Sequence, residues 1–216
     1  IPVETMAGTV AEDETIRPTT TPEGLGQLKV SFGSDEMKAR YPHIDWRVTA
    51  GNSSQITDGA SWVILASEEA VVKHSLTPKA AIIDSQWSAL DPSIMGLGPV
   101  LSATALLRRN ELSLQDVETW ELNEAFATQV LGCLAAWNDA KFCKEVLGLE
   151  GPAGEIDRAK LNVDGGAISL GHPVGTSGNR IVLHLVNAMK RLGTRRGIAT
   201  ECIGGGQGGA MLIEMV

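Results

Sequence analysis

The longest periodic stretch of apolar positions lies between residues 176 and 193. Apolar side chains recur there every three or four residues, which is the spacing of one face of an amphipathic helix. Charged and polar residues occupy the other side, and Gly193 is typical of a residue that ends a helix. We therefore predict a helix over 176–193 that buries Ile181, Val182, Leu185, Val186, Met189 and Leu192.

Shorter patterns before and after this helix predict alternating strands and helices. Apolar or β-prone runs favour strands at 61–67, 79–87 and 118–122, and helices are expected at 99–110 and from about Asn123 to Trp137. Two further runs, 196–203 and 210–216, flank a glycine-rich turn, as in a hairpin. From residue 79 onward the order indicates the α/β class, with helices packed on a mixed β-sheet.

The first part of the chain has no sustained period. Residues 1–42 contain a turn-rich stretch at 19–26 and one short helical turn at 35–42, which Pro42 ends. Residues 46–67 are predicted to form a strand, a polar loop and the buried strand at 61–67, and a short helix follows before Pro78. Residues 138–160 are charged and rich in turn formers, which is typical of a surface excursion.

Composition and charge exclude several classes of protein. The 216 residues carry a net charge of −8, whereas nucleic-acid binders usually show a basic stripe. Three cysteines without a CxxC pair give neither a disulfide framework nor a zinc site, so we expect no metal and a reducing, cytoplasmic location. No apolar run is long enough to span a membrane, and the first residues lack the pattern of a signal peptide.

The segment GHPVGTSG at 171–178 holds the first candidate site residue. Pro173 restricts His172 to an extended backbone, and the glycines allow a tight turn into the predicted helix. An imidazole just ahead of a helix N-terminus can polarise an oxygen or activate a thiol, and the helix dipole favours an anion nearby. The alternative is a loop histidine without a role. For His43, His74 and His184 we expect a role in packing and none in function.

Two further segments, CIGGGQGG at 202–209 and NEAFA at 123–127, each hold one chemically capable side chain. Cys202 precedes three glycines, which let a ligand approach, although a buried cysteine can equally be a small hydrophobe. Asn123 can donate to an oxyanion or cap the following helix. A thiol, an amide and an imidazole beside accessible backbone together favour acyl-group chemistry. Cys133, Cys143, Trp120 and Trp137 are expected to serve packing.

Together these segments resemble the C-terminal half of the thiolases, the CoA-dependent 3-ketoacyl-CoA and acetoacetyl-CoA acyltransferases. The similarity includes, in order, TAGNSSQITDGA (49–60), MGLGP (95–99), NEAFA, GGAISLGHPVGTSG and CIGGGQGG, and it covers essentially the whole chain. It implies the layered thiolase-like fold and an acyltransferase of fatty-acid metabolism (β-oxidation). The expected reaction is thiolytic cleavage of 3-ketoacyl-CoA to acetyl-CoA and a shortened acyl-CoA, or the reverse Claisen condensation.

The resemblance also implies a role for each site residue. His172 matches the histidine that activates a nucleophilic cysteine and contributes to an oxyanion hole, Asn123 matches the asparagine that holds a water at an oxyanion site, and Cys202 matches the acid/base cysteine. Coenzyme A and acyl-CoA are substrates, and no permanent cofactor is expected. A homodimer or tetramer is implied for the full-length protein. Residues implied at the CoA and acyl sites are Ser54, Arg17, Phe32 and Met95.

The resemblance divides the chain into three parts and leaves one gap. Residues 1–53 match the end of the CoA-binding loop domain, 54–77 the last helix and strand of the N-terminal domain, and 78–216 a C-terminal domain. The family's nucleophilic cysteine lies in the N-terminal half, whereas this chain has no cysteine before Cys133. We therefore interpret the chain as beginning partway through a larger protein, and expect it to be inactive alone.

Three other classes of protein compete with the thiolase interpretation of the sequence. Ketoacyl synthases use two histidines and lack a counterpart of Cys202. Sterol-carrier-type thiolases typically vary the NEAF segment, which is intact here. A non-catalytic acyl-CoA-binding scaffold would have no reason to keep Asn123, His172 and Cys202 together.

Overall fold

The computed structural model describes residues 2–13 and 15–216, and it separates into two compact units after Gly51. The first unit contains an antiparallel hairpin of β1 (Val3–Thr5) and β2 (Gly8–Val10), followed by helices α1 (Pro22–Gly26) and α2 (Asp35–Arg40). The 3-10 turn η1 (Ala50–Asn52) spans the boundary between the units. The short helix predicted at 35–42 is confirmed as α2.

The turn-rich stretch at 19–26 contains the helix α1, which the sequence analysis did not predict. The Thr21 side chain accepts a hydrogen bond from the Gly24 N–H, and Pro22 occupies the first turn, where its missing N–H is not needed. A cap and a proline were therefore enough to begin one turn of helix. The strand predicted at the start of 46–67 is reduced to a single bridge between Val30 and Thr49.

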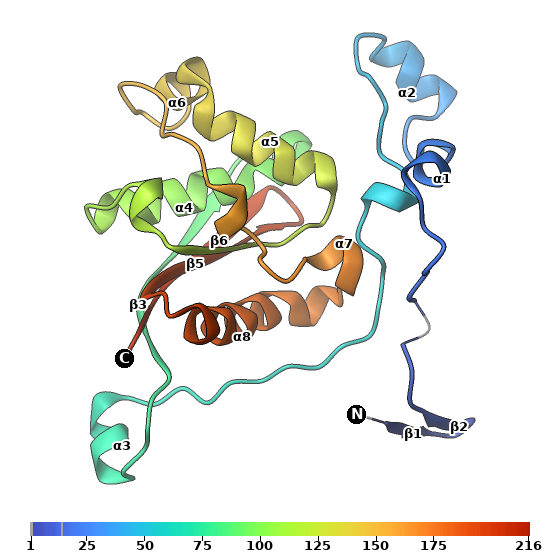
Figure 1. Ribbon diagram of the computed structural model, residues 1–216. Helices are drawn as coiled ribbons and strands as arrows, with labels where there is room; N and C mark the ends of the chain where they lie inside the picture. Colours follow the sequence, from blue (N-terminus) through green and yellow to red (C-terminus); the bar gives the residue numbers. More distant parts are fainter. Residues whose placement is uncertain (1, 14) are drawn as a thin grey trace. The chain divides into compact units, whose positions relative to one another are not determined.

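The second unit is built on a mixed four-stranded sheet. Its strands are β3 (Ala80–Ala89), β4 (Thr119–Leu122), β5 (Arg196–Ile203) and β6 (Gln207–Met215), in the spatial order β3-β6-β5-β4. Strand β6 runs antiparallel to both of its neighbours, and β4 runs parallel to β5 (Figure 1). The predicted mixed sheet is therefore confirmed.

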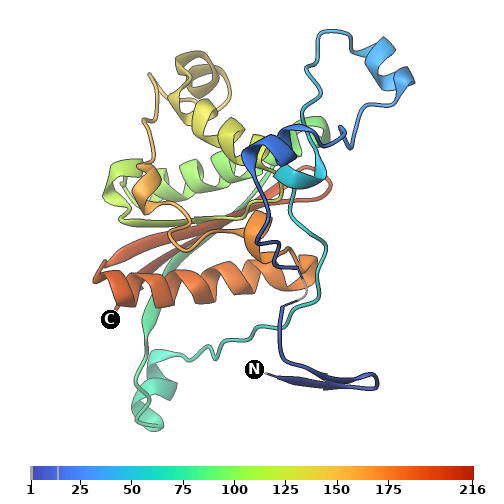
Figure 2. The same ribbon diagram turned by 45° about the vertical axis from the view of Figure 1, so that its right-hand side comes forward.

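Helices cover both faces of this sheet. Helices α4 (Gly98–Arg109), α5 (Ala127–Asn138) and α6 (Ala140–Glu145) lie on one side, and α8 (Val174–Leu192) lies on the other (Figure 2). The remaining short helices are α3 (Glu68–Lys73), η2 (Pro92–Leu97), η3 (Leu114–Asp116), η4 (Arg158–Lys160) and α7 (Ala167–Leu170).

Alternate residues of the central strands enter two separate cores. Ile198 and Leu212 pack with the α4 and α5 side, whereas Ala199 and Ile213 pack against α8. This two-residue alternation is what a sheet buried on both faces requires. The periodic face predicted for 176–193 is confirmed for Ile181, Leu185 and Met189, which are buried, and Gly193 ends α8 in the left-handed conformation at φ 70°. Burial of Leu192 was predicted wrongly, since its side chain is 49% exposed in the last turn of the helix.

The buried strand predicted at 61–67 is wrong. The segment is irregular, and its side chains are exposed, with Trp62 at 75% and Ile64 at 78%. A strand is stable only when a neighbour pairs with its N–H and C=O groups, and no described strand lies beside this segment. An apolar run alone therefore did not fix its structure.

Two further expectations need adjustment. Helix α5 begins at Ala127 with Phe126 in the cap position, so Asn123 is not its cap. The 138–160 excursion contains α6 and buries Cys143 and Ile156, so it contributes to the core.

The packing roles expected for the cysteines and tryptophans agree with the structure. Cys133 and Cys143 are fully buried, and the rings of Trp120 and Trp137 pack together with their centroids 5.8 Å apart. Within the described part of the chain, no helix combines the length and apolarity needed to cross a membrane.

Candidate active site

Asn123 leaves the end of β4 at the carboxyl edge of the sheet. Its backbone N–H donates to the Thr200 carbonyl on the adjacent strand β5 at 3.0 Å, which extends the parallel pairing by one residue. The side chain is 1% exposed, and its Oδ1 atom has no hydrogen-bond partner among the described residues. Its Nδ2 atom lies 3.5 Å from His172 Nε2. A buried amide without a partner for its oxygen is rare in a purely structural role.

His172 lies between α7 and α8, and its ring is held from both nitrogens. Ser177 Oγ is 2.6 Å from Nδ1, and Asn123 Nδ2 faces Nε2. One assignment satisfies every contact: Ser177 O–H donates to the Pro173 carbonyl, Nδ1–H donates to Ser177 Oγ, and Nε2 accepts from Asn123. The ring is then neutral, with its basic nitrogen toward Asn123.

Burial and charge both favour this neutral ring. Burial lowers the pKa of His172 below its ordinary value, and the nearby positive charge of Arg180 lowers it further. The backbone is fixed as well, because the His172 N–H donates to the Gln55 carbonyl at 2.8 Å. Gly171 precedes it at φ 93°, and a Cβ there would lie 2.5 Å from the Thr57 side chain.

Cys202 lies near the end of β5, one strand away from Asn123. It is 8% exposed, and burial raises the pKa of its thiol to about 11, with a further contribution from Glu201. The thiol is therefore protonated at neutral pH and disposed to act as an acid. Because β4 and β5 are parallel, with Leu122 opposite Thr200, Asn123 and Cys202 lie at the same end of the sheet, where both strands reach their carboxyl ends.

Some of the glycines after Cys202 are required by close backbone packing, whereas the sequence analysis expected them to leave space for a ligand. Gly206 has φ 85°, and a Cβ there would lie 2.4 Å from the Leu90 carbonyl. A Cβ on Gly208 would lie 2.2 Å from the carbonyl oxygen of Gly98 in α4. These two positions are glycine because the chain's own backbone fills the space, whereas Gly204 has no heavy atom within 4 Å of a built Cβ. Gly204 and Gly205 are thus the two glycines of this segment with open space beside them, since a Cβ on Gly205 would meet only the end of the Gln207 side chain at 4.0 Å.

The residues expected at the CoA and acyl sites are spread over the two units. In the second unit, the N–H and the hydroxyl of Ser54 both donate to the Ala125 carbonyl at 3.0 Å, which ties this residue to the NEAFA segment. Met95 is partly buried in η2. Arg17 and Phe32 are exposed and belong to the first unit. The structure therefore brings Ser54 next to the Asn123 segment, while the roles of all four remain predictions.

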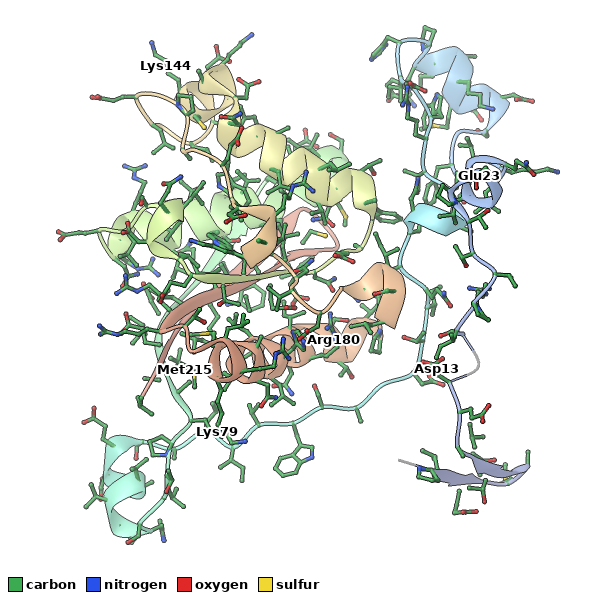
Figure 3. The ribbon with its side chains drawn as sticks, in the orientation of Figure 1. Asp13, Glu23, Lys79, Lys144, Arg180 and Met215 are labelled. Atoms are coloured by element: carbon green, nitrogen blue, oxygen red, sulfur yellow. The ribbon has the colours of Figure 1, made fainter. Side chains whose placement is uncertain are left out.

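Sequence reasoning missed two side chains that support the site. Ser177 holds His172 Nδ1, and Arg180, one turn later on α8 (Figure 3), has buried Nε and Nη2 atoms and carries a charge that lowers the pKa of His172. Both are polar residues at helical spacing with His184, on a helix whose apolar face is elsewhere. In the sequence, this row of polar residues on one face of a predicted helix was the signal that could have pointed to Ser177 and Arg180.

Comparison with known proteins identifies the family. Residues 76–215 match the family model described as thiolase, C-terminal domain, and residues 1–69 match thiolase, N-terminal domain. The human protein named 3-ketoacyl-CoA thiolase, mitochondrial, is 43% identical over 99% of this chain and 48% of its own length. The beta-ketoadipyl-CoA thiolase of Pseudomonas aeruginosa is 44% identical over 96% of this chain and 45% of its own.

The solved structures agree. The crystal structure of human mitochondrial 3-ketoacyl-CoA thiolase in complex with CoA matches with a TM-score of 0.79 and 42% identity, over 100% of this chain and 48% of that one. The chain therefore spans about half the length of the relatives it matches.

The names of the relatives correct one expectation. A cytoplasmic location was expected from the cysteine usage and the absence of a signal-peptide pattern, but the human relative is named as mitochondrial. Three unpaired cysteines report a reducing environment and do not distinguish compartments that share one. The matched family models, which cover nearly all of the chain, and the shared fold lead to one conclusion: this chain belongs to the thiolase family.

Proposed function

We propose that this chain supplies the oxyanion and proton-transfer half of a thiolase active site that acts on 3-ketoacyl-CoA. The observation that carries the proposal is the pair formed by Asn123 Nδ2 and His172 Nε2 at 3.5 Å, at the sheet edge that also bears Cys202. Coenzyme A and acyl-CoA are the proposed substrates, in fatty-acid metabolism, and a solved relative in complex with CoA supports this. For the full-length protein we expect a dimer or tetramer.

The Nε2 atom of a neutral His172 can first accept a proton and then donate a hydrogen bond to an oxyanion. This atom is an acceptor, so it can take the proton of a nucleophilic thiol, and the resulting Nε2–H then becomes a donor. A donor at that position, with the amide of Asn123 beside it, can stabilise the negative charge that develops on a thioester oxygen. Ser177 keeps Nδ1 protonated throughout and so fixes which nitrogen does this work.

Cys202 is proposed as the acid and base at the α-carbon. In thiolysis, cleavage of the carbon–carbon bond leaves its electron pair on the α-carbon of the departing acetyl-CoA, and the protonated thiol can deliver a proton there. In condensation the thiolate takes that proton back. A thiol pKa of about 11 favours the acid role at neutral pH, because the proton stays on sulfur until a strong base forms.

The test uses the full-length enzyme and acetoacetyl-CoA. We expect Cys202→Ser to lower kcat for thiolysis by roughly 10²–10⁴-fold, the usual contribution of a positioned acid or base, with KM changed much less. Cys143→Ala is the matched control, since this cysteine lies in α6 away from the sheet edge, and it should retain wild-type kcat. A Cys202→Ser enzyme with wild-type turnover would refute the assignment.

A further inference from the structure

Strand β4 lies at the edge of the sheet, and a loop closes its outer side. In the order β3-β6-β5-β4 this strand pairs with β5 alone. On its other side, the Asn162 N–H donates to the Trp120 carbonyl at 2.9 Å, and Leu161 forms a single parallel bridge with Trp120. An edge strand needs such partners because its outward N–H and C=O groups otherwise stay unpaired.

The side chain of Asn162 takes the next position along this edge. Its Oδ1 accepts from the Leu122 N–H at 2.9 Å, and its Nδ2 donates to the Leu122 carbonyl at 2.9 Å. The amide thus makes both hydrogen bonds that a partner strand would make with Leu122. The same Nδ2 also donates to Glu124 Oε1 at 2.7 Å. Asn162 therefore holds the residue before Asn123 and the residue after it.

Glu124 connects the same segment to the part of the chain that leads into His172. Its Oε2 accepts from the Ile168 N–H in α7 at 3.3 Å. Gly166, just before α7, lies against this carboxylate, because a Cβ there would lie 2.2 Å from Glu124 Cδ. Helix α7 ends two residues before His172. The carboxylate therefore ties the segment that carries Asn123 to the segment that carries His172.

The turn at Asn162 does not itself require an asparagine side chain. Asn162 has φ 47°, in the left-handed region, where glycine is the least strained residue. The backbone closes the turn, since the Gly165 N–H donates to the Asn162 carbonyl at 2.8 Å. Both polar atoms of the side chain instead contact the segment after β4 and the end of the strand itself. What the amide holds is therefore the reason to look for a role.

We propose that Asn162 is a positioning residue, whose amide sets the position of Asn123 opposite His172. It acts through the backbone of Leu122 and the carboxylate of Glu124, and it needs no contact with the substrate. The inference rests on the proposed function, in which Asn123 and His172 stabilise an oxyanion. Their Nδ2 and Nε2 atoms lie 3.5 Å apart, and a displacement of about 1 Å in such a site costs about a hundredfold in rate.

The first test measures the contact without catalysis. In the full-length protein, hydrogen exchange at the Leu122 amide should be at least about tenfold faster in Asn162→Gly, because its acceptor is gone. Glycine tolerates the turn at φ 47°, so this variant removes the side chain and keeps the backbone conformation. Mass spectrometry of overlapping peptides around Leu122 measures the exchange. Wild-type protection of this amide in Asn162→Gly would overturn the inference.

The second test is kinetic and uses acetoacetyl-CoA with the full-length enzyme. Asn162→Gly should lower kcat for thiolysis by roughly 10–100-fold with KM within about twofold, because a misplaced oxyanion group weakens transition-state binding more than substrate binding. Asn162→Asp keeps the shape but sets an oxygen against the Leu122 carbonyl and the Glu124 carboxylate, so it should lower kcat at least as much. If Asn162→Gly does not fold, a wild-type kcat in Asn162→Asp would by itself refute the role.

A matched control lies at the far end of α4. Asn110 Nδ2 also donates to a carboxylate, Asp84 Oδ2 at 2.7 Å, and to a backbone carbonyl, that of Leu106 at 2.8 Å. It follows α4, about 18 Å along the helix from Gly98, which contacts the hairpin after Cys202. Asn110→Asp removes the same kinds of hydrogen bond away from the carboxyl end of β4 and should retain wild-type kcat. An equal loss of kcat in Asn110→Asp and Asn162→Asp would count against a specific role.

A double variant separates positioning from a general loss of structure. Asn123→Ala removes the group that Asn162 is proposed to position, so adding Asn162→Gly to it should lower kcat by less than about twofold further. The same fold loss in both backgrounds would mean that Asn162 acts on the fold as a whole, and the inference would be wrong. A wild-type kcat in Asn123→Ala would instead reject the proposed function, and the exchange at Leu122 would then decide alone whether Asn162 holds this segment.

Discussion

At the scale of single residues, burial has opposite effects on the two side chains that are proposed as acid and base. His172 is kept neutral, with its pKa lowered by burial and by Arg180, while burial raises the pKa of the Cys202 thiol to about 11. At neutral pH one side chain is therefore a ready proton acceptor and the other a ready donor. The two opposite shifts have the same main cause, because burial disfavours the charged form of either group.

The raised thiol pKa predicts how Cys202 reacts with an alkylating agent. Only the thiolate attacks iodoacetamide, so the rate at Cys202 should rise about tenfold per pH unit from neutral pH and level off near pH 11. Mass spectrometry of the peptide containing Cys202 measures this rate. Cys133, fully buried with a pKa of about 12, should react more slowly throughout and serves as the internal reference. A plateau at pH 8–9 for Cys202 would contradict the burial effect.

At the scale of elements, the close approach of α4 to β6 holds the hairpin after Cys202 in place. Gly98 at the start of α4 and Gly208 on β6 meet backbone to backbone, and Leu90 closes on Gly206 in the turn. The turn therefore cannot move without displacing the helix. A rigid support of this kind is what a proton-transfer group needs to stay within reach of its substrate.

This contact predicts a specific stability difference between two glycine substitutions. A Cβ on Gly98 would lie 2.4 Å from the Gln207 carbonyl, so Gly98→Ala should lower the free energy of unfolding by about 1–3 kcal/mol. Gly132 in α5 has only an ordinary contact at 3.6 Å with Leu97, so Gly132→Ala should raise it by about 0.5–1 kcal/mol. Urea denaturation followed by circular dichroism compares the two, and equal midpoints would show that α4 yields to the added methyl group.

At the scale of the whole molecule, the described chain carries three thiols, all of them buried. Cys133 and Cys143 are fully buried in the α4 and α5 core, and Cys202 already has a proposed role in proton transfer. A thiolase reaction also needs a nucleophile that forms an acyl-enzyme. We therefore expect the nucleophile to come from outside these 216 residues.

This predicts that the 216-residue chain alone does not catalyse thiolysis. Purified chain mixed with acetoacetyl-CoA and CoA should give no acetyl-CoA above the uncatalysed rate, measured by liquid chromatography. The full-length enzyme at the same concentration is the positive control. Turnover that scales with the chain's concentration and disappears in Cys202→Ser would show that one of the three thiols also serves as nucleophile.

Sequence alone was sufficient where a segment's own neighbours determine its structure. Helix α8 and strands β3, β5 and β6 were predicted because their spacing and turn residues are local signals. The segment 61–67 was assigned wrongly because a strand exists only with a pairing partner. The candidate site followed from ordered segments, yet the hydrogen bond that His172 donates to Ser177 and the charge of Arg180 could be found only from the fold.

The position of β6 has a consequence for synthesis on the ribosome. This strand is made after β3, β4 and β5, yet it lies between β3 and β5 in the sheet. Until it emerges, β3 has no strand to pair with and β5 has one open side, so a nascent chain exposes two unpaired edges. A stop or a proteolytic cut within Gln207–Met215 would thus remove the strand that joins the sheet, and Cys202 would lose its support although its own codon had been translated.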